Sequence, residues 1–357
     1  MTAATMHAFV KHGSTPGDAG LTMVNVPEPG EGEALIRVAA CGICGSDLHA
    51  VACDSGYEQV RTPRILGHES AGTVAAVAPG CQRIRPGARV VPVSIQGCLR
   101  CDVCVTGATQ LCPHRVILGL DRDGALAEYL TVPEAQLVPV PTGLDLTASA
   151  LTEPLTVAVH AALDRTRIEP GTRVVVTGPG TIGLLCAQLA RAAGGDVLVA
   201  GARTDTVRRL PLARRLGLHA ADIESRSAGA VLRRHFGSRQ PDAWIEASGA
   251  APALQAALES VRAGGQVTIV AMYAEPLSLL LTGLIRREVS VLTSYAAGIS
   301  HYLRALDLLR TGVVDAEPLL DRFPLARADQ AFTAARQGRA VKPLLIPDDH
   351  DSGRRSG

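Results

Sequence analysis

The sequence predicts an α/β protein with two domains, an irregular β domain followed by a doubly wound parallel sheet. Between Met6 and about Val140, short β-rich runs are punctuated by proline and glycine, which is typical of irregular β structure. From about Arg173, short apolar strands alternate with helical stretches, and this rhythm indicates a parallel sheet covered by helices. The 357 residues suit two domains of ordinary size.

The β-rich runs of the first domain are separated by turn residues, and we expect strands at Ala34–Ala40, Gly72–Val77, Ala88–Val93 and Glu128–Val132. The second domain begins with the apolar strand Arg173–Thr177 and the helix Thr181–Ala193, which ends at a Gly-Gly pair. The strand Asp196–Ala200 follows and leads into a helical stretch through Arg215. Further strands of this domain are expected at Asp242–Ala247, Gln266–Met272 and Glu288–Ser294.

The end of the chain is expected to rejoin the first domain. After Tyr295 the sequence predicts a helix at Ser300–Leu309 and short extended pieces that end at Pro343–Ile346. We therefore assign residues 1–156 and 296–357 to the first domain, with a metal-binding lobe at 97–113, and residues 157–295 to the second.

Composition excludes several classes of protein. The net charge of +1 argues against electrostatic binding of nucleic acid. Hydrophobic content is 47%, yet no apolar run reaches the roughly 18 residues that a membrane span requires. The first residues lack the apolar core of a signal peptide, so the nine cysteines indicate a reducing compartment, the cytoplasm.

Four cysteines share the short segment Cys98-x-x-Cys101-x-x-Cys104-x7-Cys112. Four thiolates at this spacing can close a tetrahedral shell around Zn²⁺. The flanking glycines Gly97 and Gly107 allow the tight backbone that such a loop needs. Because four protein ligands leave no open position, this zinc is structural and the chemistry lies elsewhere.

A glycine-rich loop follows the strand Arg173–Thr177 directly and leads into a helix. It reads Gly178-Pro179-Gly180-Thr181-Ile182-Gly183. Between a buried strand and a helix, this pattern predicts a dinucleotide site, with the pyrophosphate at the N-terminus of the helix. The predicted contacts in the loop are Gly178, Gly180, Thr181, Ile182 and Gly183.

The end of the second strand departs from the pattern for NAD. Gly201 stands where an acidic residue would bind the ribose 2′-hydroxyl, and Arg203 and Arg208 follow. Missing acid and nearby guanidinium groups favour a 2′-phosphate, hence NADP over NAD, although Asp205 can still turn back to the ribose. Two further candidate cofactor contacts lie at or after later strands, Ser248 and Val270.

A second cluster of polar residues suits a catalytic zinc, which takes three protein ligands and keeps one open position. Cys44 and His68 are the natural first ligands. The third is Glu69 or Glu153, and the sequence leaves both open. Glu69 can also act by orienting other ligands, and nearby Cys41 is expected to be a small buried hydrophobe.

Together these motifs resemble the zinc-dependent medium-chain dehydrogenases. The resemblance extends from about Met6 to Ile346, and the motifs occur in the family's order and at approximately its spacing. These motifs are Cys44, Gly67-His68-Glu69, the four-cysteine lobe, Glu153-Pro154-Leu155 and Gly178–Gly183. The resemblance implies a GroES-like β domain and a Rossmann domain, two zinc ions per chain and NADP or NAD. It also implies an assembly of two or four identical subunits and a small-molecule alcohol or ketone as the reaction partner.

Glu153 occupies the position that is cysteine in liver-type alcohol dehydrogenases, so the chain looks more like the sorbitol and threonine dehydrogenase branch. The resemblance implies oxidation of a secondary alcohol on a polyol, sugar or aminocyclitol. Polar residues between His49 and His68 suit such a substrate, or equally a solvent-facing loop. Ser46 and His49 are the implied proton relay, although His49 can instead be a solvated surface residue. The alternatives are oxidation of an amino alcohol, as in L-threonine dehydrogenase, or a non-catalytic relative.

Overall fold

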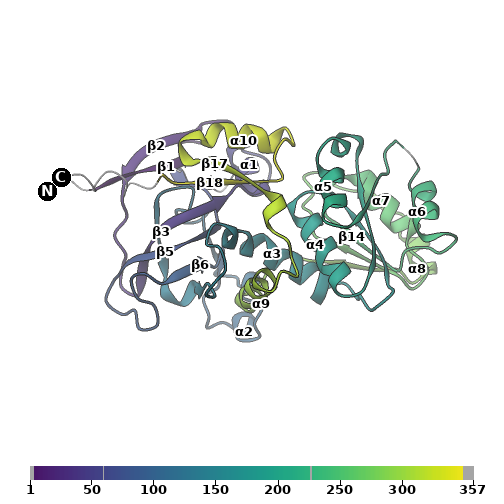
Figure 1. Cartoon of the computed structure of the whole chain (residues 1–357), viewed down its shortest axis with the longest axis horizontal. Coiled ribbons are helices and arrows are strands. Elements are labelled where there is room, and N and C mark those ends of the chain that lie inside the picture. Colours follow the sequence, from purple (N-terminus) through teal and green to yellow (C-terminus); the bar gives the residue numbers. More distant parts are fainter. Residues whose placement is uncertain (1–3, 59, 226, 349–357) are drawn as a thin grey trace. The chain divides into compact units, whose positions relative to one another are not determined.

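The computed structural model describes residues 4–348 apart from 59 and 226, and it divides the chain into two compact units (Figure 1). The first unit contains the chain up to Glu153, the segment Gly298–Leu306 and the chain from Leu320 on. The second unit contains Pro154–Ala297 and Asp307–Leu319.

Antiparallel β structure dominates the first unit. Within the described residues, the larger sheet has seven strands in the order β10-β6-β5-β3-β18-β17, and β9 pairs with β3. These strands are β3 (Glu33–Gly42), β5 (Glu69–Val77), β6 (Arg89–Pro92), β9 (Tyr129–Pro133), β10 (Leu137–Pro139), β17 (Leu320–Pro324) and β18 (Lys342–Ile346). The smaller sheets are β2-β1-β4, from Ala19–Asn25, Thr5–Lys11 and Arg64–Ile65, and β7-β8, from Ile95–Gln96 and Val116–Ile117.

The C-terminal strand returns to the first unit, as the sequence predicts. Strand β18 runs antiparallel to β3, with Leu344 opposite Gly42 and Leu345 opposite Cys41. This pairing brings Lys342 beside the segment that leads to Cys44.

Short helices complete the first unit. They are α1 (Gly45–Ala52), α2 (Asp102–Val105) and α10 (Ala328–Arg336), while α3 (Thr152–Val159) and α9 (Ile299–Arg310) each contain a unit boundary. Helix α10 places Phe332 against Phe9 of β1, with ring centroids 4.3 Å apart. This stacked pair belongs to the apolar core that also buries Cys41 and Ile43 beside the metal-ligand candidates.

A parallel sheet forms the centre of the second unit. Its order, β13-β12-β11-β14-β15-β16, is that of the doubly wound dinucleotide-binding fold. The strands are β11 (Arg173–Thr177), β12 (Asp196–Gly201), β13 (His219–Asp222), β14 (Ala243–Glu246), β15 (Gln266–Ile269) and β16 (Ser290–Thr293). The helices are α4 (Thr181–Ala192), α5 (Arg209–Arg215), α6 (Ala228–Phe236), α7 (Ala251–Ser260) and α8 (Leu281–Arg286). The predicted fold class is confirmed.

The two units differ from the predicted division at their boundaries. Residues 154–156, 296–297 and Asp307–Leu319 belong to the second unit, whereas the sequence assigns them to the first. The Gln188 side chain of α4 binds the segment Asp307–Leu319, because its amide donates to the Asp315 carbonyl and accepts from the Asp315 N–H at 2.8 Å. Among the described residues, no helix has the length and apolarity to cross a membrane.

Candidate active site

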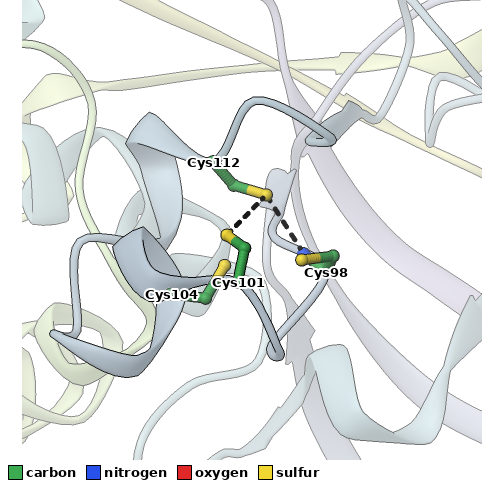
Figure 2. Close-up of side chains that lie close together, drawn as sticks. All are labelled: Cys98, Cys101, Cys104 and Cys112. Carbon is green, nitrogen blue, oxygen red and sulfur yellow. Dashed lines mark hydrogen bonds between the residues drawn. The ribbon is translucent and has the colours of Figure 1, made fainter.

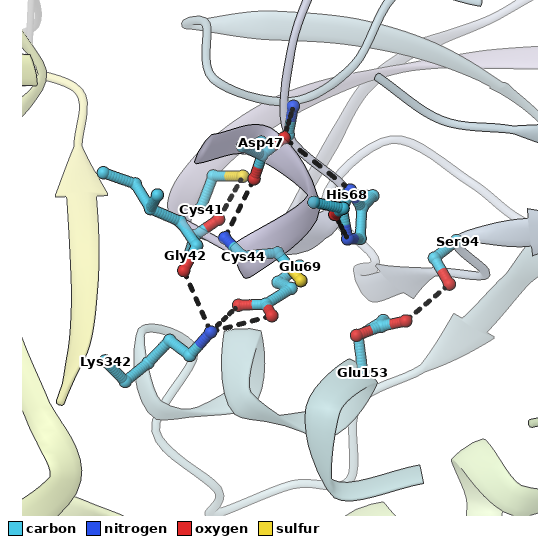
Figure 3. A network of polar contacts seen from close by, with 12 residues as sticks. Cys41, Gly42, Cys44, Asp47, His68, Glu69, Ser94, Glu153 and Lys342 are labelled. Carbon is cyan, nitrogen blue, oxygen red and sulfur yellow. Dashed lines mark hydrogen bonds and ion pairs between the residues drawn. The ribbon is translucent and has the colours of Figure 1, made fainter. Parts of the chain in front are cut away.

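Cys44, His68 and Glu69 converge in the first unit, and their ligand atoms all lie within 4.8 Å of one another (Figure 3). Cys44 is the N-cap of α1, and Glu69 is the first residue of β5, directly after His68. His68 and Glu69 are buried, whereas Cys44 is partly exposed. Three of the four predicted ligands therefore form one donor group, and Glu153 lies outside that group.

Asp47 ties the two ligand-bearing segments together, a role that the sequence analysis missed. Its carboxylate accepts from the Cys44 N–H at 2.9 Å and from the Gly67 N–H at 3.0 Å, and it lies 3.9 Å from His68 Nδ1. Asp47 is completely buried, and burial raises its pKa although His68 and the backbone donors partly offset this. An acidic residue three positions after the N-cap was the available signal, since it matches a capping box.

Gly67 lets the histidine segment pass close to its neighbours. It has a φ of +93°, and a Cβ there would lie 2.5 Å from the Leu126 side chain and 2.9 Å from Cys41 Sγ. Only glycine adopts such a conformation in so little space without strain. The glycine before His68 therefore sets where the imidazole lies.

Lys342 binds Glu69 from the C-terminal strand. Its Nζ lies 2.7 Å from Oε1 and 2.5 Å from Oε2 of Glu69, and it also donates to the Ile43 carbonyl. Burial by itself lowers the pKa of Lys342, but Glu69 and Cys44 more than offset this and raise it. Glu69 thus forms a buried ion pair with Lys342 and at the same time lies beside Cys44 and His68.

Glu153 is held by a different set of groups. Ser94 Oγ donates to Glu153 Oε1 at 2.7 Å (Figure 3), and the Tyr302 hydroxyl donates to Ser94 Oγ at 3.1 Å. The Tyr302 oxygen in turn accepts from the Ser94 N–H at 2.9 Å. Burial raises the pKa of Glu153, a shift that His68 partly offsets. The sequence analysis missed both hydroxyl residues, since nothing local marks residues 208 positions apart as neighbours.

The donor set fits a zinc ion. One sulfur, one imidazole and one carboxylate, with a second carboxylate close enough to act on His68, are the ligand types of catalytic zinc. In addition, His68 Nδ1 is buried and has no hydrogen-bond partner among the described residues. Burial alone lowers the pKa of His68, but Asp47 and Cys44 raise it well above its usual value.

The two predicted relay residues lie on α1. Ser46 Oγ is 3.4 Å from His68 Nε2 and partly exposed. His49 is exposed, its Nδ1 is 2.7 Å from Asp54 Oδ2, and its ring stacks on Tyr57. The two residues are three positions apart, so they share one face of the helix.

The four cysteines of the lobe converge as a second group (Figure 2). Cys101 Sγ and Cys112 Sγ are 3.7 Å apart, close to the ~3.8 Å that tetrahedral geometry with Zn–S of about 2.3 Å requires. The Arg100 and Cys101 N–H groups lower the pKa of Cys98 to about 6, while burial raises the pKa of Cys104 to about 12. Four thiols that converge in one place fit a cation that binds all of them as thiolates.

The glycine-rich loop has the geometry of a phosphate cradle in the second unit. Gly178 has a φ of +87° and packs against the turn after β14, where a Cβ would lie 2.7 Å from Ser248 Cα. At Gly183 a Cβ would collide with the Gly178 carbonyl. Gly180, the N-cap of α4, has open space around its Cβ position, so a pyrophosphate can approach the start of the helix at Thr181 and Ile182.

Comparison with known proteins decides the family. The model of the alcohol dehydrogenase GroES-like domain matches residues 30–142, and the zinc-binding dehydrogenase model matches residues 181–311. Sorbitol dehydrogenase of Halalkalibacterium halodurans is 34% identical over 96% of this chain and all of its own length. The chain belongs to the zinc-dependent medium-chain alcohol dehydrogenases.

Other members of the family are similar over nearly the same length. L-galactonate-5-dehydrogenase of Escherichia coli is 32% identical over 86% of this chain and 89% of its own length. L-threonine 3-dehydrogenase of Streptomyces coelicolor is 34% identical over 95% of this chain and 99% of its own. A zinc-binding dehydrogenase from Sinorhizobium meliloti, solved with NADP bound, superimposes with a TM-score of 0.87 at 32% identity and covers 96% of this chain and 100% of its own. This dehydrogenase is therefore a zinc enzyme that uses NAD(P).

The residues predicted to select the cofactor lie at the end of β12. Arg203 and Arg208 are exposed after the strand. The Asp205 carboxylate accepts from the Ala202 N–H at 2.9 Å, and its other oxygen is 3.3 Å from Arg209. The Asp205 carboxylate does turn back toward Gly201, but it is already bound to the Ala202 N–H and to Arg209.

Ser248 and Val270 follow β14 and β15, at the same edge of the sheet as Gly178. Ser248 donates through its N–H and its hydroxyl to Glu246 Oε1, which is buried at the end of β14. Tyr273 donates to the other oxygen of Glu246 at 2.6 Å. The Val270 N–H donates to the Glu246 carbonyl at 2.9 Å. Glu246 thus fixes this edge of the sheet, which the sequence analysis did not foresee.

Proposed function

We propose that this dehydrogenase interconverts a secondary alcohol of a polyol, sugar or aminocyclitol and the corresponding ketone. The observation that carries the proposal is that two buried carboxylates lie near His68, since Glu69 shares the donor group with Cys44 and Glu153 is close enough to act on His68. The family resemblance implies that Glu153 occupies the position that is cysteine in liver-type alcohol dehydrogenases. The similarity to a sorbitol dehydrogenase and an L-galactonate-5-dehydrogenase supports a substrate with several hydroxyl groups.

Cys44 and His68 hold the catalytic zinc, and one of the two glutamates completes the ligand set. Glu69 lies within the donor group but forms an ion pair with Lys342, whereas Glu153 accepts a hydrogen bond from a neutral hydroxyl group. The two carboxylates are thus alternative zinc ligands, one paired with a charged group and the other with an uncharged group. A zinc ion bound here supplies Lewis acidity that polarises the oxygen of the alcohol or ketone.

Ser46 and His49 move the proton of the substrate hydroxyl. Ser46 lies beside His68, and a hydroxyl group can accept one proton while it donates another. His49 is open to solvent, so its ring can exchange a proton with water. Asp54 orients the His49 ring through Nδ1, which leaves Nε2 to exchange the proton.

The function is tested with purified, zinc-replete protein and a substrate panel read by the absorbance of the reduced nicotinamide. We expect kcat/KM for polyols, sugar alcohols and aminocyclitols to exceed that for ethanol by about 100-fold or more, because buried polar groups penalise a substrate that cannot pair with them. Cys44→Ala should abolish turnover with one zinc fewer per chain, and Ser46→Ala should keep its zinc but lose ~10²-fold in rate. Turnover confined to simple primary alcohols would contradict the proposal.

Oxidation of an amino alcohol is the second candidate function. The L-threonine 3-dehydrogenase of Streptomyces coelicolor matches this chain at the same identity as the sorbitol dehydrogenase. L-Threonine therefore belongs in the same panel, and exclusive turnover of L-threonine would replace the polyol assignment.

NADP is the proposed cofactor. Arg203 and Arg208 can bind a 2′-phosphate, and Asp205 is engaged by Ala202 and Arg209 rather than presented to a ribose. The structural relative solved with NADP supports this choice. In the same assay, kcat/KM should be higher with NADP than with NAD, and Arg203→Ala should reduce that preference.

The active form is proposed to be a homo-oligomer of two or four subunits in the cytoplasm. Exposed apolar side chains gather on α8 and the edge strand β16, among them Leu280, Leu281, Ile285 and Val291. Such a surface is typical of a subunit interface. All nine cysteines are free thiols, which fits a reducing compartment.

A further inference from the structure

Lysine occurs at only two positions in this sequence, and both side chains are buried. Lys342 pairs with Glu69 in the active site. Lys11, the last residue of β1, is 2% exposed, and its Nζ lies 3.0 Å from Cys53 Sγ. Among the described residues, no carboxylate lies within 4.0 Å of Lys11 Nζ. The sulfur is thus the polar partner of a buried ammonium group.

A buried ammonium group is costly unless an anion or a strong acceptor faces it. A cysteine sulfur can accept a hydrogen bond from such a group, and a neighbouring lysine stabilises the negative charge that the sulfur gains when it acts as a nucleophile. Cys53 is held in place for this contact. It caps α1 in a left-handed conformation with a φ of 55°, and its Sγ also donates to the Ser14 carbonyl at 3.1 Å. Cys53 is partly exposed, so a small oxidant can reach it.

We propose that Cys53 and Lys11 form a peroxide-reactive site outside the metal centre. The Cys53 sulfur attacks one oxygen of hydrogen peroxide, an S–O bond forms and the O–O bond breaks. The proton of the thiol passes to the departing oxygen, which leaves as water, and the Lys11 ammonium group stabilises the negative charge that develops during the step. Sulfur is oxidised by two electrons to a sulfenic acid, and the peroxide is reduced.

The chain offers a matched control in Cys81. It lies in the same unit and is also partly exposed, but its Sγ donates to the Glu33 carbonyl at 3.3 Å rather than facing a lysine. Burial and the nearby Glu134 raise the pKa of its thiol. Each sulfur thus donates to a backbone carbonyl, and Cys53 differs in that it also accepts from the Lys11 ammonium group.

The test treats reduced, zinc-loaded protein with dilute hydrogen peroxide and a dimedone probe, which traps sulfenic acids, and maps the labelled peptides over time. We expect Cys53 to be labelled about 10-fold faster than Cys81 or more. Lys11→Met should bring the rate at Cys53 down to that at Cys81, whereas Lys11→Arg, which keeps the positive charge, should retain most of it. Equal labelling of the two cysteines in the wild-type protein, or a rate at Cys53 that Lys11→Met leaves unchanged, would overturn the proposal. The wild-type comparison alone decides it if Lys11→Met does not fold.

Discussion

At the scale of single residues, the two candidate glutamate ligands differ in what holds them. Glu69 faces the ammonium group of Lys342, and Glu153 faces the hydroxyl of Ser94, which Tyr302 orients. A charged partner competes with a metal for the carboxylate, whereas a hydroxyl group positions it and leaves its charge intact. Supporting residues of this kind govern how well a ligand binds its metal.

The role of this hydroxyl pair can be measured through zinc binding. We expect Ser94→Ala to weaken the catalytic site about 10- to 100-fold, measured by competition with a chelator, because Glu153 loses the group that aims it. Tyr302→Phe should have a smaller effect in the same direction, since it removes only the group that orients Ser94.

The matched control is Ser149→Ala, which removes a completely buried serine that bonds the Asp145 carbonyl instead. An equal change in zinc affinity in Ser149→Ala would mean that the effect is general loosening of the fold rather than positioning of Glu153.

At the scale of elements, the four-cysteine lobe has little secondary structure of its own. Helix α2 within it has four residues, and the strands β7 and β8 that flank it have two each. Such short elements are marginal without a cross-link. We therefore expect Cys101→Ser to lose one zinc per chain and to expose the lobe to proteolysis, while Cys44 and His68 keep the other zinc. Metal analysis and mapped limited proteolysis check this, and loss of both ions would contradict the independence of the two sites.

Asp242 joins two elements of the second unit. Its carboxylate binds Arg173 at the start of β11 at 2.7 and 2.8 Å and also binds Arg262 after α7. The hydrogen bonds from Arg173 hold the pKa of Asp242 well below its usual range, although partial burial opposes this. A carboxyl group with a depressed pKa adds stability above its ordinary value of about 3.9, and this stability is lost as the pH falls toward the folded-state value.

The chain contains one tryptophan, Trp244, buried in β14 two residues after Asp242, so its fluorescence follows this unit. In urea unfolding at about pH 6, Asp242→Asn should be less stable than the wild type by roughly 2 kcal/mol. The gap should narrow steadily below about pH 4, because the Asp242 carboxyl group then binds a proton in the unfolded chain while it stays ionised in the folded chain. A constant gap across that range would show that the charge of Asp242 is not what stabilises the unit.

The elements whose ends are marked by glycine residues are those that the sequence predicts best. Strand β11 has the predicted bounds Arg173–Thr177, and α4 ends one residue before the predicted Ala193, because the loop and the Gly-Gly pair mark both ends. The strand predicted at Gln266–Met272 stops at Ile269, since apolar character continues past the last ladder hydrogen bond. The strand predicted at Glu288–Ser294 begins at Ser290, since Glu288 has a φ of 51°.

In the active site, motif spacing predicts the donors Cys44, His68 and Glu69 but not the groups that hold them. Lys342 lies 273 positions from Glu69, and pairing of β18 with β3 alone brings them together. Contacts of this kind depend on how distant strands pair in the sheet, and no local sequence pattern predicts them.

At the scale of the whole molecule, the parallel sheet of the second unit ends in a strand that no other described strand covers. Strand β16 pairs with β15 on one side only, and Val291 on it is 41% exposed. The preceding helix α8 adds Leu281 and Ile285, 58% and 72% exposed, and Leu280 lies just before it. An open strand edge beside exposed apolar side chains invites pairing with another chain.

A second copy of this chain is the partner that suits such an edge, because two identical edges can meet around a two-fold axis and bury the same residues from both sides. We therefore expect Ile285→Glu to shift the mass measured by light scattering toward the monomer, since it places two like charges in the contact. Val207→Glu is the matched control, because Val207 is 86% exposed in the same unit but follows β12. If Ile285→Glu keeps the wild-type mass, or if Val207→Glu lowers it as much, the subunits meet through a different surface.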